Sequence, residues 1–532
     1  MFDLVIRDGI IVDGSGNPRK RGDVGFIRER IGAIGGPRSL VGREYIDAEG
    51  LFLAPGFVDI HSHADRAILA NPLCRSSLLQ GITTLVAGNC GNSQAPLNEA
   101  MKARVVERAR ASGVEDFVPP DWQTFGEFLT RVEENGTGVN FAMFVGQGTI
   151  RGHVVGPDDR EATPDEIRSM RSLVRDAMRQ GALGLSAGRT YVPGRYAKPA
   201  EVAELCKEVE PFGGLYACHM KSEGDEIFQA IDELLDIAES SGCRPHIVHC
   251  KVVGRENWGK APEALARIER AREGGTDLLY DVYPYNFAQV STLKGMLSGV
   301  FPRINIGEVL SKLRRDPGYA SALATEAEAR MSAQDPVWFG GLPQRGVVWC
   351  QSTREHEFKS IQEIADDLGI GLVATIVWLA VENHLGVKTA YLMDEQEVSM
   401  VIRHPFAMIS TDAATTDSTE DRSGAAHPRG FGTYPRVLGL YVRDKGTLSL
   451  EEAIRKMTSI PAERAGLPDR GRVREGYFAD LTVFDKDTVG ERGTLDSPCK
   501  EPAGIHYVFV NGKMAVKEGN LVGARAGKVL RR

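Results

Sequence analysis

The middle of this chain alternates short apolar runs with longer amphipathic stretches, and this rhythm restricts the fold more than any other feature. Most runs are followed by a stretch with helical spacing, such as Pro164–Gln180, Pro199–Phe212 or Glu226–Ser241. Eight runs have the composition of buried strands: 53–59, 83–87, 139–145, 184–186, 214–217, 245–249, 278–283 and 407–411. Strands that alternate with helices form parallel sheets, so eight such units predict an α/β fold, a closed (β/α)8 TIM barrel.

Both ends of the chain have the pattern of short strands instead. Near the start, apolar runs at residues 4–6 and 10–12 flank a turn-like stretch at 7–9. Near the end, strand-like runs cover 480–485 and 506–513, and the second contains the hairpin signal Asn511-Gly512. We therefore expect one small β-sandwich assembled from both termini.

These patterns predict how the chain divides into domains. Residues 1–55 and 466–532 would form the β-sandwich, and residues 56–465 would form the barrel. Between about 287 and 345 there is a helix-like stretch (Ile306–Arg330) and no clean barrel strand. We expect this segment to be an insertion over the barrel mouth.

Charge and cysteine usage restrict the partners and the compartment. The net charge is −8, without a run of five or more like charges, which argues against a basic nucleic-acid surface. The sequence has neither a secretory signal pattern nor an apolar window that approaches the roughly 18–20 residues of a membrane span. The eight cysteines are scattered without paired spacing, as reduced thiols are. We expect a cytoplasmic protein with a small-molecule substrate, no nucleic-acid partner and no membrane partner; a homo-oligomer remains open.

Potential metal ligands follow five of the predicted strands. In a β/α barrel the active site lies at the carboxyl ends of the strands. Residues two apart in a strand share a face, so the first pair of histidines can point at one ion. Imidazole, thiolate and carboxylate groups together suit Zn²⁺. The candidates, in chain order, are His61, His63, Cys90, His219, His249 and Asp412.

Each candidate also has a structural interpretation on its own. A lone His-x-His motif is more often incidental than metal-binding, and a lone buried cysteine usually packs as a small apolar residue. His219 or His249 alone would most often be a hydrogen-bonded core or loop histidine. The prediction of a metal site therefore depends on the presence of metal-binding residue types at all five strand ends.

Several motifs resemble the N-acyl-D-amino-acid deacylase (D-aminoacylase) family of the amidohydrolase superfamily. The resemblance runs over nearly the whole chain and is weakest in the expected insertion and around 417–426. The matching segments are Ala54–His63, Gly88–Gly91, Gly184–Gly188, Tyr283–Tyr285, His427–Arg429, Pro435–Gly439, Pro461–Leu467 and Gly476–Leu481.

The resemblance implies a role for each candidate residue. Cys90, His219 and His249 would hold one tightly bound zinc, with the cysteine in the place where many relatives in the superfamily have a carbamylated lysine. His61, His63 and Asp412 would line a second, weaker metal position. Four further residues would bind the α-carboxylate of the substrate: Tyr191, Lys251, Tyr283 and Arg429.

The implied reaction is hydrolysis of the amide bond of an N-acyl-D-amino acid to a carboxylate and a free D-amino acid. Zinc would polarise the carbonyl and activate a water molecule. Asp412 would take the proton of that water as general base and return it to the departing amine as general acid. The D enantiomer comes from the resemblance alone. Lys251 and Arg429 could instead form structural ion pairs, and the two tyrosines could be ordinary packing at the barrel mouth.

Three features depart from the family pattern. Gln147 stands where the family usually has a histidine, and a neutral amide cannot act as acid or base. Arg189 follows Gly188 where the family tends to be apolar. The polar residues between Asp412 and His427 can reshape the substrate pocket.

Two other functions remain open. The same metal site could serve an amidohydrolase that acts on cyclic amides or dipeptides. The barrel could also be a catalytically silent scaffold, because a fold alone does not fix function. The filled ligand positions favour an enzyme, and the segment His427–Arg429 favours the deacylase.

Overall fold

The computed structural model describes residues 1–111, 117–288, 393–420, 426–494 and 497–532, together with short stretches between 311 and 390. Most of the predicted insertion, from about 287 to 345, lies outside the described residues, as does the centre of the segment 417–426. No helix among the described residues combines the length and apolar character that crossing a lipid bilayer requires.

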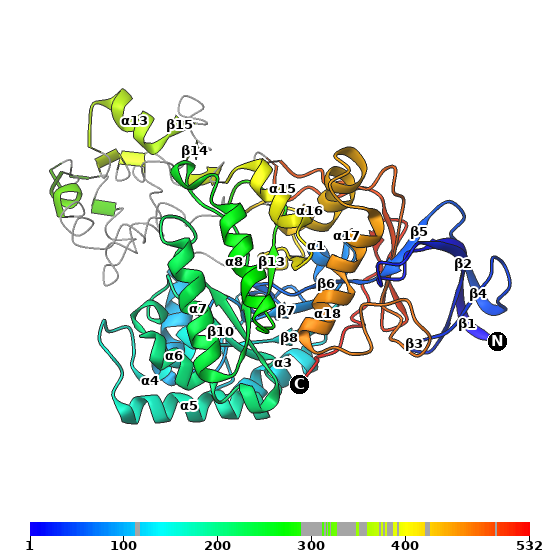
Figure 1. The fold of residues 1–532 in the computed structure, drawn as a ribbon, viewed down its shortest axis with the longest axis horizontal. Coiled ribbons are helices and arrows are strands. Elements are labelled where there is room, and N and C mark those ends of the chain that lie inside the picture. Colours follow the sequence, from blue (N-terminus) through cyan, green and yellow to red (C-terminus); the bar gives the residue numbers. More distant parts are fainter. Residues whose placement is uncertain are drawn as a thin grey trace.

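The predicted barrel is confirmed, and within the described residues it has eight parallel strand positions (Figure 1). One of these positions is interrupted at Phe144, so that it consists of β8 followed by β9. The barrel closes where Ser62 and Ala413 form a parallel bridge and Asp412 N donates to His61 O at 2.9 Å. The strands are β6 (Phe57–Asp59), β7 (Ile82–Ala87), β8 (Asn140–Met143), β9 (Val145–Gly146), β10 (Gly184–Gly188), β11 (Leu215–His219), β12 (Arg244–Ile247), β13 (Leu279–Val282) and β17 (Ala407–Ile409).

The first predicted strand, 53–59, is wrong as a single element. It divides at Gly56 into β5 (Phe52–Pro55), which belongs to the terminal sheet, and β6 of the barrel. The glycine is required because a Cβ there would lie 2.2 Å from Thr83 Oγ1. The chain therefore passes from one domain to the other where β7 packs directly against its backbone.

The outer helices begin and end at local signals. Thr163 and Glu166 form a capping box at the start of α5 (Pro164–Arg179), and α7 (Ile227–Ser241) ends at the left-handed Gly242. The predicted helix 199–212 is shorter in the structure, because Pro211 cannot continue an α-helix. It consists of α6 (Pro199–Cys206) and a 3₁₀ turn over Glu210–Phe212.

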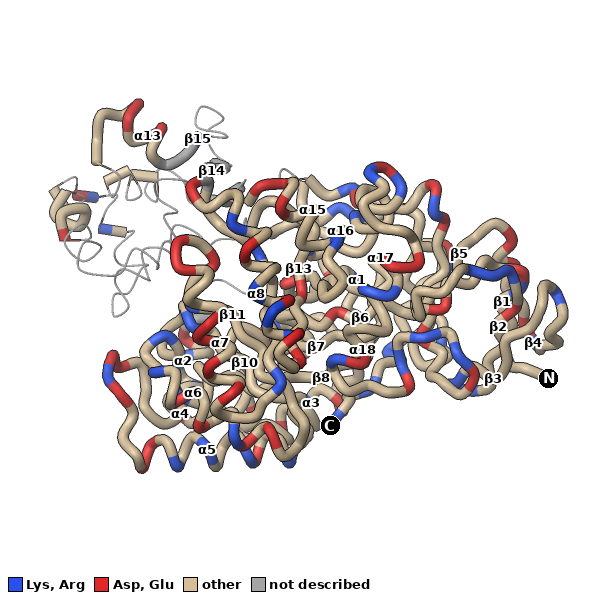
Figure 2. The backbone as a smooth tube through the Cα atoms, in the orientation of Figure 1, with Lys and Arg blue, Asp and Glu red and all other residues tan. Residues whose placement is uncertain are grey.

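Further α-helices of the described residues follow in chain order. They are α1 (Arg75–Leu78), α2 (Glu99–Ala111), α3 (Phe125–Asn135), α4 (Gln147–Val154), α8 (Ala261–Glu273), α13 (Ile361–Leu368), α15 (Glu395–Arg403), α16 (Arg429–Arg436), α17 (Leu450–Met457) and α18 (Ser459–Ala465). Charged residues of both signs alternate along the outer helices in Figure 2. Between α5 and α6, Arg171 pairs with Glu204 at 2.9 Å and with Glu208 at 2.7 Å. Such partly exposed pairs contribute about 0–1 kcal/mol each, so buried apolar surface carries most of the stability.

The terminal sheet is built from both ends of the chain, as predicted. Its nine described strands are β1 (Phe2–Ile11), β2 (Lys20–Ile27), β3 (Arg30–Gly35), β4 (Gly42–Asp47), β5, β18 (Leu481–Phe484), β19 (Ile505–Val510), β20 (Lys513–Lys517) and β21 (Asn520–Leu521). Phe26 and Phe509, on strands that are not neighbours, make an edge-to-face contact at 5.3 Å. The sheet therefore curls over a small core of its own.

Two details of the terminal sheet test the sequence patterns. The expected strands at 4–6 and 10–12 are one strand, β1, with a bulge between Ile6 and Gly9, and the turn expected at 7–9 is wrong. Asp8 absorbs the irregularity with a φ of 61°. The hairpin prediction is confirmed: Asn511 and Gly512 have φ values of 50° and 74°, as a two-residue turn requires.

The last residues of the chain pack against the barrel at the end opposite the predicted site. Phe141, near the start of β8, donates to Lys528 O at 2.8 Å and accepts from Leu530 N at 2.7 Å. Gly527 N donates to Thr137 O at 2.8 Å. No pattern in the sequence indicated this contact.

We predict that Gly527→Ala destabilises the protein by about 1–3 kcal/mol, as overpacked sites do. The added Cβ would lie 1.8 Å from Val139 O, a backbone atom beside β8 that cannot move away cheaply. Chemical unfolding followed by circular dichroism measures the effect. Gly36→Ala is the control, because a methyl group there meets no atom within 4 Å; equal stability of the two variants would contradict the prediction.

Candidate metal centre and active site

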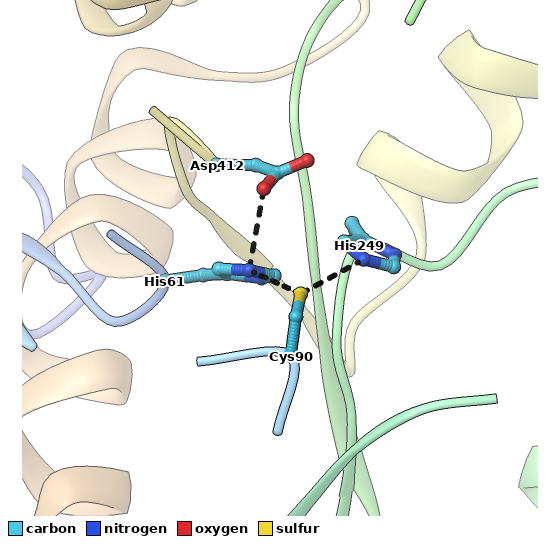
Figure 3. A group of neighbouring side chains, drawn as sticks. All are labelled: His61, Cys90, His249 and Asp412. Carbon is cyan, nitrogen blue, oxygen red and sulfur yellow. Dashed lines mark hydrogen bonds and ion pairs between the residues drawn. The ribbon is translucent and has the colours of Figure 1, made fainter. Parts of the chain in front are cut away.

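Four buried donor groups converge at the carboxyl ends of the barrel strands (Figure 3). His61 follows β6, Cys90 follows β7, His249 follows β12 and Asp412 follows β17. One donor atom from each lies within 4.8 Å of all the others. Cys90 Sγ is 3.4 Å from His61 Nε2 and 3.5 Å from His249 Nε2, and His61 Nε2 is 3.3 Å from Asp412 Oδ1.

Each of these three pairs has a separation that fits two ligands of one metal ion. Zinc bonds of about 2.0–2.3 Å at tetrahedral angles place neighbouring donor atoms about 3.3–3.5 Å apart. The three separations from the sulfur and from His61 fall in that range. Two imidazoles, one thiol and one carboxylate form a donor set that zinc accepts.

The backbone at the site is strained. Cys90, His249 and Asp412 have φ values of 54°, 38° and 49°, in the left-handed region that residues other than glycine rarely adopt. Such strain persists only where the surrounding structure enforces it, and it is concentrated at functional sites. Each strand therefore turns sharply as it delivers its donor group to the rim.

The loop that carries Cys90 is held by β10, two strand positions further round the barrel. Ser186 Oγ donates to Gly88 O at 2.5 Å and accepts from Gly91 N at 3.1 Å. Gly91 has a φ of 73°, and a Cβ there would lie 2.4 Å from Gly188 N. The two glycine-rich motifs thus pack against each other and fix the thiol.

His63 and His219 are the other two predicted ligands, and each lies beside one member of this group. His63 Nε2 lies 3.1 Å from Asp412 Oδ1, on the predicted side. The ring centres of His219 and His249 lie 4.4 Å apart, and His219 Nε2 lies 3.1 Å from Thr190 Oγ1. His219 belongs to a second donor group that shares His249: His219, Glu223 and His249.

Charges at the site stabilise the ionised forms of its acids. Burial alone would raise the pKa of the Cys90 thiol, but His61 and His249 outweigh burial and hold this pKa well below its usual value. Burial would likewise raise the pKa of Asp412, but Arg429 and His61 hold that pKa well below its ordinary range. A thiolate and a carboxylate are the forms that bind metal.

Asp281, inside β13, is a central residue that the sequence patterns missed. Its Oδ1 accepts from Ser410 Oγ at 2.5 Å and from His249 N at 3.0 Å, and lies 3.1 Å from His61 Nδ1. Its Oδ2 lies 2.9 Å from His246 Nε2. An acidic residue within the apolar run 278–283 was the signal that could have revealed it, because a buried charge needs partners.

Both predicted substrate cations already have carboxylate partners. Arg429 Nη1 donates to Asp412 Oδ2 at 2.8 Å, and Lys251 Nζ donates to Glu223 Oε1 at 2.7 Å. Tyr283 lies between them, with its ring centre 4.9 Å from Arg429 Cζ and 5.5 Å from Lys251 Nζ.

Two buried polar atoms beside these cations are available to bind a ligand. Tyr283 Oη and Arg429 Nε are buried and have no hydrogen-bond partner among the described residues. Tyr191 is 44% exposed and packs its ring 4.9 Å from that of His219. All four predicted substrate residues thus lie near the donor groups.

The departures from the family pattern have different structural meanings. Gln147 is fully buried at the start of α4, and neither amide atom has a partner among the described residues. Arg189 is a structural anchor, because it donates to Glu233 at 3.0 Å and to the carbonyls of Gly194 and Ala197. Asp417 accepts from Arg75 N at 2.9 Å and so belongs to the scaffold.

The barrel and its converging donor atoms define a metal-dependent hydrolase. Residues 44–282 and 409–516 match the profile described as Amidohydrolase family. The chain is 34% identical to a D-aminoacylase of Alcaligenes xylosoxydans xylosoxydans, over 100% of this chain and 98% of that protein. It is 33% identical to an N-acyl-D-glutamate deacylase of the same organism, over 100% of this chain and 97% of that protein.

A solved structure resembles the whole chain as well. It is an N-acyl-D-glutamate deacylase from Bordetella bronchiseptica, complexed with zinc and a phosphonate inhibitor, with a TM-score of 0.80, 29% identity and 100% coverage of both chains. This chain belongs to the N-acyl-D-amino-acid deacylase (D-aminoacylase) family of the amidohydrolase superfamily.

We predict that Cys90→Ala weakens zinc binding by more than the roughly 10–100-fold that loss of an outer hydrogen-bond partner costs. Competition with a chromophoric chelator measures the affinity. Cys74→Ala is the matched control, since burial raises the pKa of that thiol to about 12 and it lies outside both donor groups. Native zinc affinity in Cys90→Ala would contradict the assignment.

Proposed function

We propose that this protein hydrolyses the amide bond of N-acyl-D-amino acids, with bound zinc, to give a carboxylate and a free D-amino acid. The observation that carries the proposal is the buried donor group of His61, Cys90, His249 and Asp412, next to two cations and an unpartnered phenol. Relatives named for D-amino acid substrates support the choice of enantiomer.

We assign the metal ligands as the family resemblance implies. Cys90, His219 and His249 would hold the tightly bound zinc, and His61, His63 and Asp412 would line a weaker second position. The place of Cys90 supports this division, because its sulfur lies within 3.5 Å of a nitrogen on either side. When bound, zinc polarises the scissile carbonyl and lowers the pKa of a bound water molecule towards about 7.

Asp412 would move the protons of the reaction. Its Oδ2 is held by Arg429, while its Oδ1 lies within 3.3 Å of both His61 and His63. Arg429 keeps the carboxylate ionised and therefore able to accept a proton from water. The protonated Asp412 carboxyl would then return this proton to the departing amine.

The substrate's α-carboxylate would bind between Arg429, Lys251 and Tyr283. The free Arg429 Nε and Tyr283 Oη are donors without partners among the described residues. Guanidinium groups favour carboxylates because they bind them in a planar, two-point geometry. Tyr191 would close the site from its exposed side.

Features outside the site complete the proposal. The limits 1–55, 56–465 and 466–532 are supported by the break at Gly56 and by the end of α18 at Ala465. A cytoplasmic location is supported by the described cysteines, which are all free thiols. We further propose that neither nucleic acid nor membrane is a partner.

We expect the zinc-loaded protein to release amine from N-acetyl-D-amino acids and not from their L enantiomers. Matched pairs of Met, Leu, Phe, Glu and Asp substrates test this and reveal the side-chain preference. A hydantoin and a dipeptide belong in the same series, because they test the alternative amidohydrolase reaction. Turnover of the cyclic amide alone would replace the proposed substrate, and no turnover of any compound would favour the scaffold.

Asp412→Asn should lower kcat by about 10²–10⁴-fold, the usual contribution of a general acid–base group. The tightly bound zinc should remain, because its proposed ligands are unchanged. Steady-state kinetics and metal analysis give both quantities. Asp225→Asn, at an exposed aspartate on the loop after β11, is the control; full activity in Asp412→Asn would exclude the proposed role.

A further inference from the structure

A single carboxylate oxygen connects the candidate metal centre to the candidate substrate cations. Glu223 lies in the loop after β11, four residues beyond His219. Its Oε1 is 2.8 Å from His249 Nδ1 and 2.7 Å from Lys251 Nζ. The three side chains are nearly excluded from solvent, with exposures of 13% for Glu223, 3% for His249 and 9% for Lys251.

The ring of His249 needs an acceptor at this position. Its Nε2 faces Cys90 Sγ at 3.5 Å, so Nε2 is the atom available to a metal. A neutral imidazole that binds metal through Nε2 carries its hydrogen on Nδ1 and donates that hydrogen to an outer partner. Glu223 Oε1 is placed to accept it.

Lys251 competes for the same ring nitrogen. Its Nζ lies 2.7 Å from His249 Nδ1. If the ammonium donated to Nδ1, the ring hydrogen would have to reside on Nε2, where it would block metal binding. Glu223 opposes this arrangement, because its Oε1 can accept a hydrogen bond from the Lys251 ammonium and another from His249 Nδ1–H. The ammonium then has no need of the ring nitrogen as an acceptor.

The same contacts leave Lys251 with a donor to spare. An ammonium group has three N–H donors. Glu223 Oε1 accepts one at 2.7 Å and His249 O accepts another at 3.0 Å. Once His249 Nδ1 carries its own hydrogen, the third N–H is available to a substrate carboxylate.

Direct metal binding by Glu223 fits the structure less well. Donor atoms of His219, Glu223 and His249 do lie within 4.8 Å of one another. However, the Lys251 ammonium already contacts Glu223 Oε1 at 2.7 Å. A cation there would be repelled by Lys251, and the carboxylate charge is already matched.

We propose that Glu223 is a positioning residue that holds His249 in its metal-binding form and Lys251 in its substrate-binding place at the same time. The Lys251 part rests on the proposed deacylase function, whereas the His249 part rests only on the metal site.

The test measures metal affinity and steady-state kinetics separately in the full-length protein. Apo-protein is titrated with Zn²⁺ against a chromophoric chelator, and KM and kcat are measured at saturating zinc with an N-acetyl-D-amino acid. Glu223→Gln should raise the zinc Kd about 10–100-fold, the usual cost of losing a ligand's outer partner, and should raise KM. Lys251→Met should raise KM and leave the zinc Kd unchanged.

The double variant gives the sharpest readout. With Lys251→Met added to Glu223→Gln, no ammonium competes for Nδ1, and the glutamine oxygen can still accept from the ring. Zinc should therefore bind more tightly than in Glu223→Gln alone, a rescue that a merely structural role would not produce. Glu226→Gln, on the same loop and exposed, should change neither quantity.

Three outcomes would overturn the inference: native zinc affinity in Glu223→Gln, no rescue in the double variant, or loss of one bound ion per chain with unchanged affinity for the rest. If Glu223→Gln did not fold, Glu223→Asp would keep the charge, shorten the reach and give the same readouts. If the native protein hydrolysed none of the substrates, the proposed function would fail, and the zinc titrations would still decide the role of Glu223.

Discussion

Buried charge is the constraint on which this site depends. A thiolate, carboxylates and cations lie at one end of the barrel, almost out of contact with water, where an unpaired charge is costly. Each carboxylate therefore has a partner: Asp281 contacts His61 and His246, Asp412 pairs with Arg429, and Glu223 pairs with Lys251. The ligand atoms can face one another only because these outer partners neutralise and orient them.

The barrel supplies the rigidity that such a network needs. Parallel strands bring their carboxyl ends to one rim, so residues far apart in the sequence meet there. Cys90, His249 and Asp412 leave their strands in the left-handed conformation, and Ser186 of β10 fixes the loop of Cys90. Because the surrounding packing enforces the strained turns, the donor atoms are held at separations that suit a metal ion.

The sequence predicted the parts of this structure that follow local rules. Strand and helix periodicity indicated the eight barrel strands, and the strand-end rule indicated His61, Cys90, His249 and Asp412. Pairings between distant segments could not be predicted in this way. The packing of Thr83 against Gly56, the contact of Leu530 with β8 and the ion pair of Arg429 with Asp412 arise only when the chain is folded. Glu223 was missed for the same reason, because an acidic residue in a loop shows its partners only in three dimensions, whereas Asp281 was overlooked although it stands inside an apolar run.

The most direct test is the X-ray absorption spectrum of the zinc-loaded protein at the zinc edge. A centre built around Cys90 and the rim histidines predicts one sulfur neighbour at about 2.3 Å together with nitrogen or oxygen neighbours at about 2.0–2.1 Å. The sulfur contribution should vanish in Cys90→Ala. A native spectrum with nitrogen and oxygen neighbours alone would contradict the metal centre described above, and with it the mechanism that depends on it.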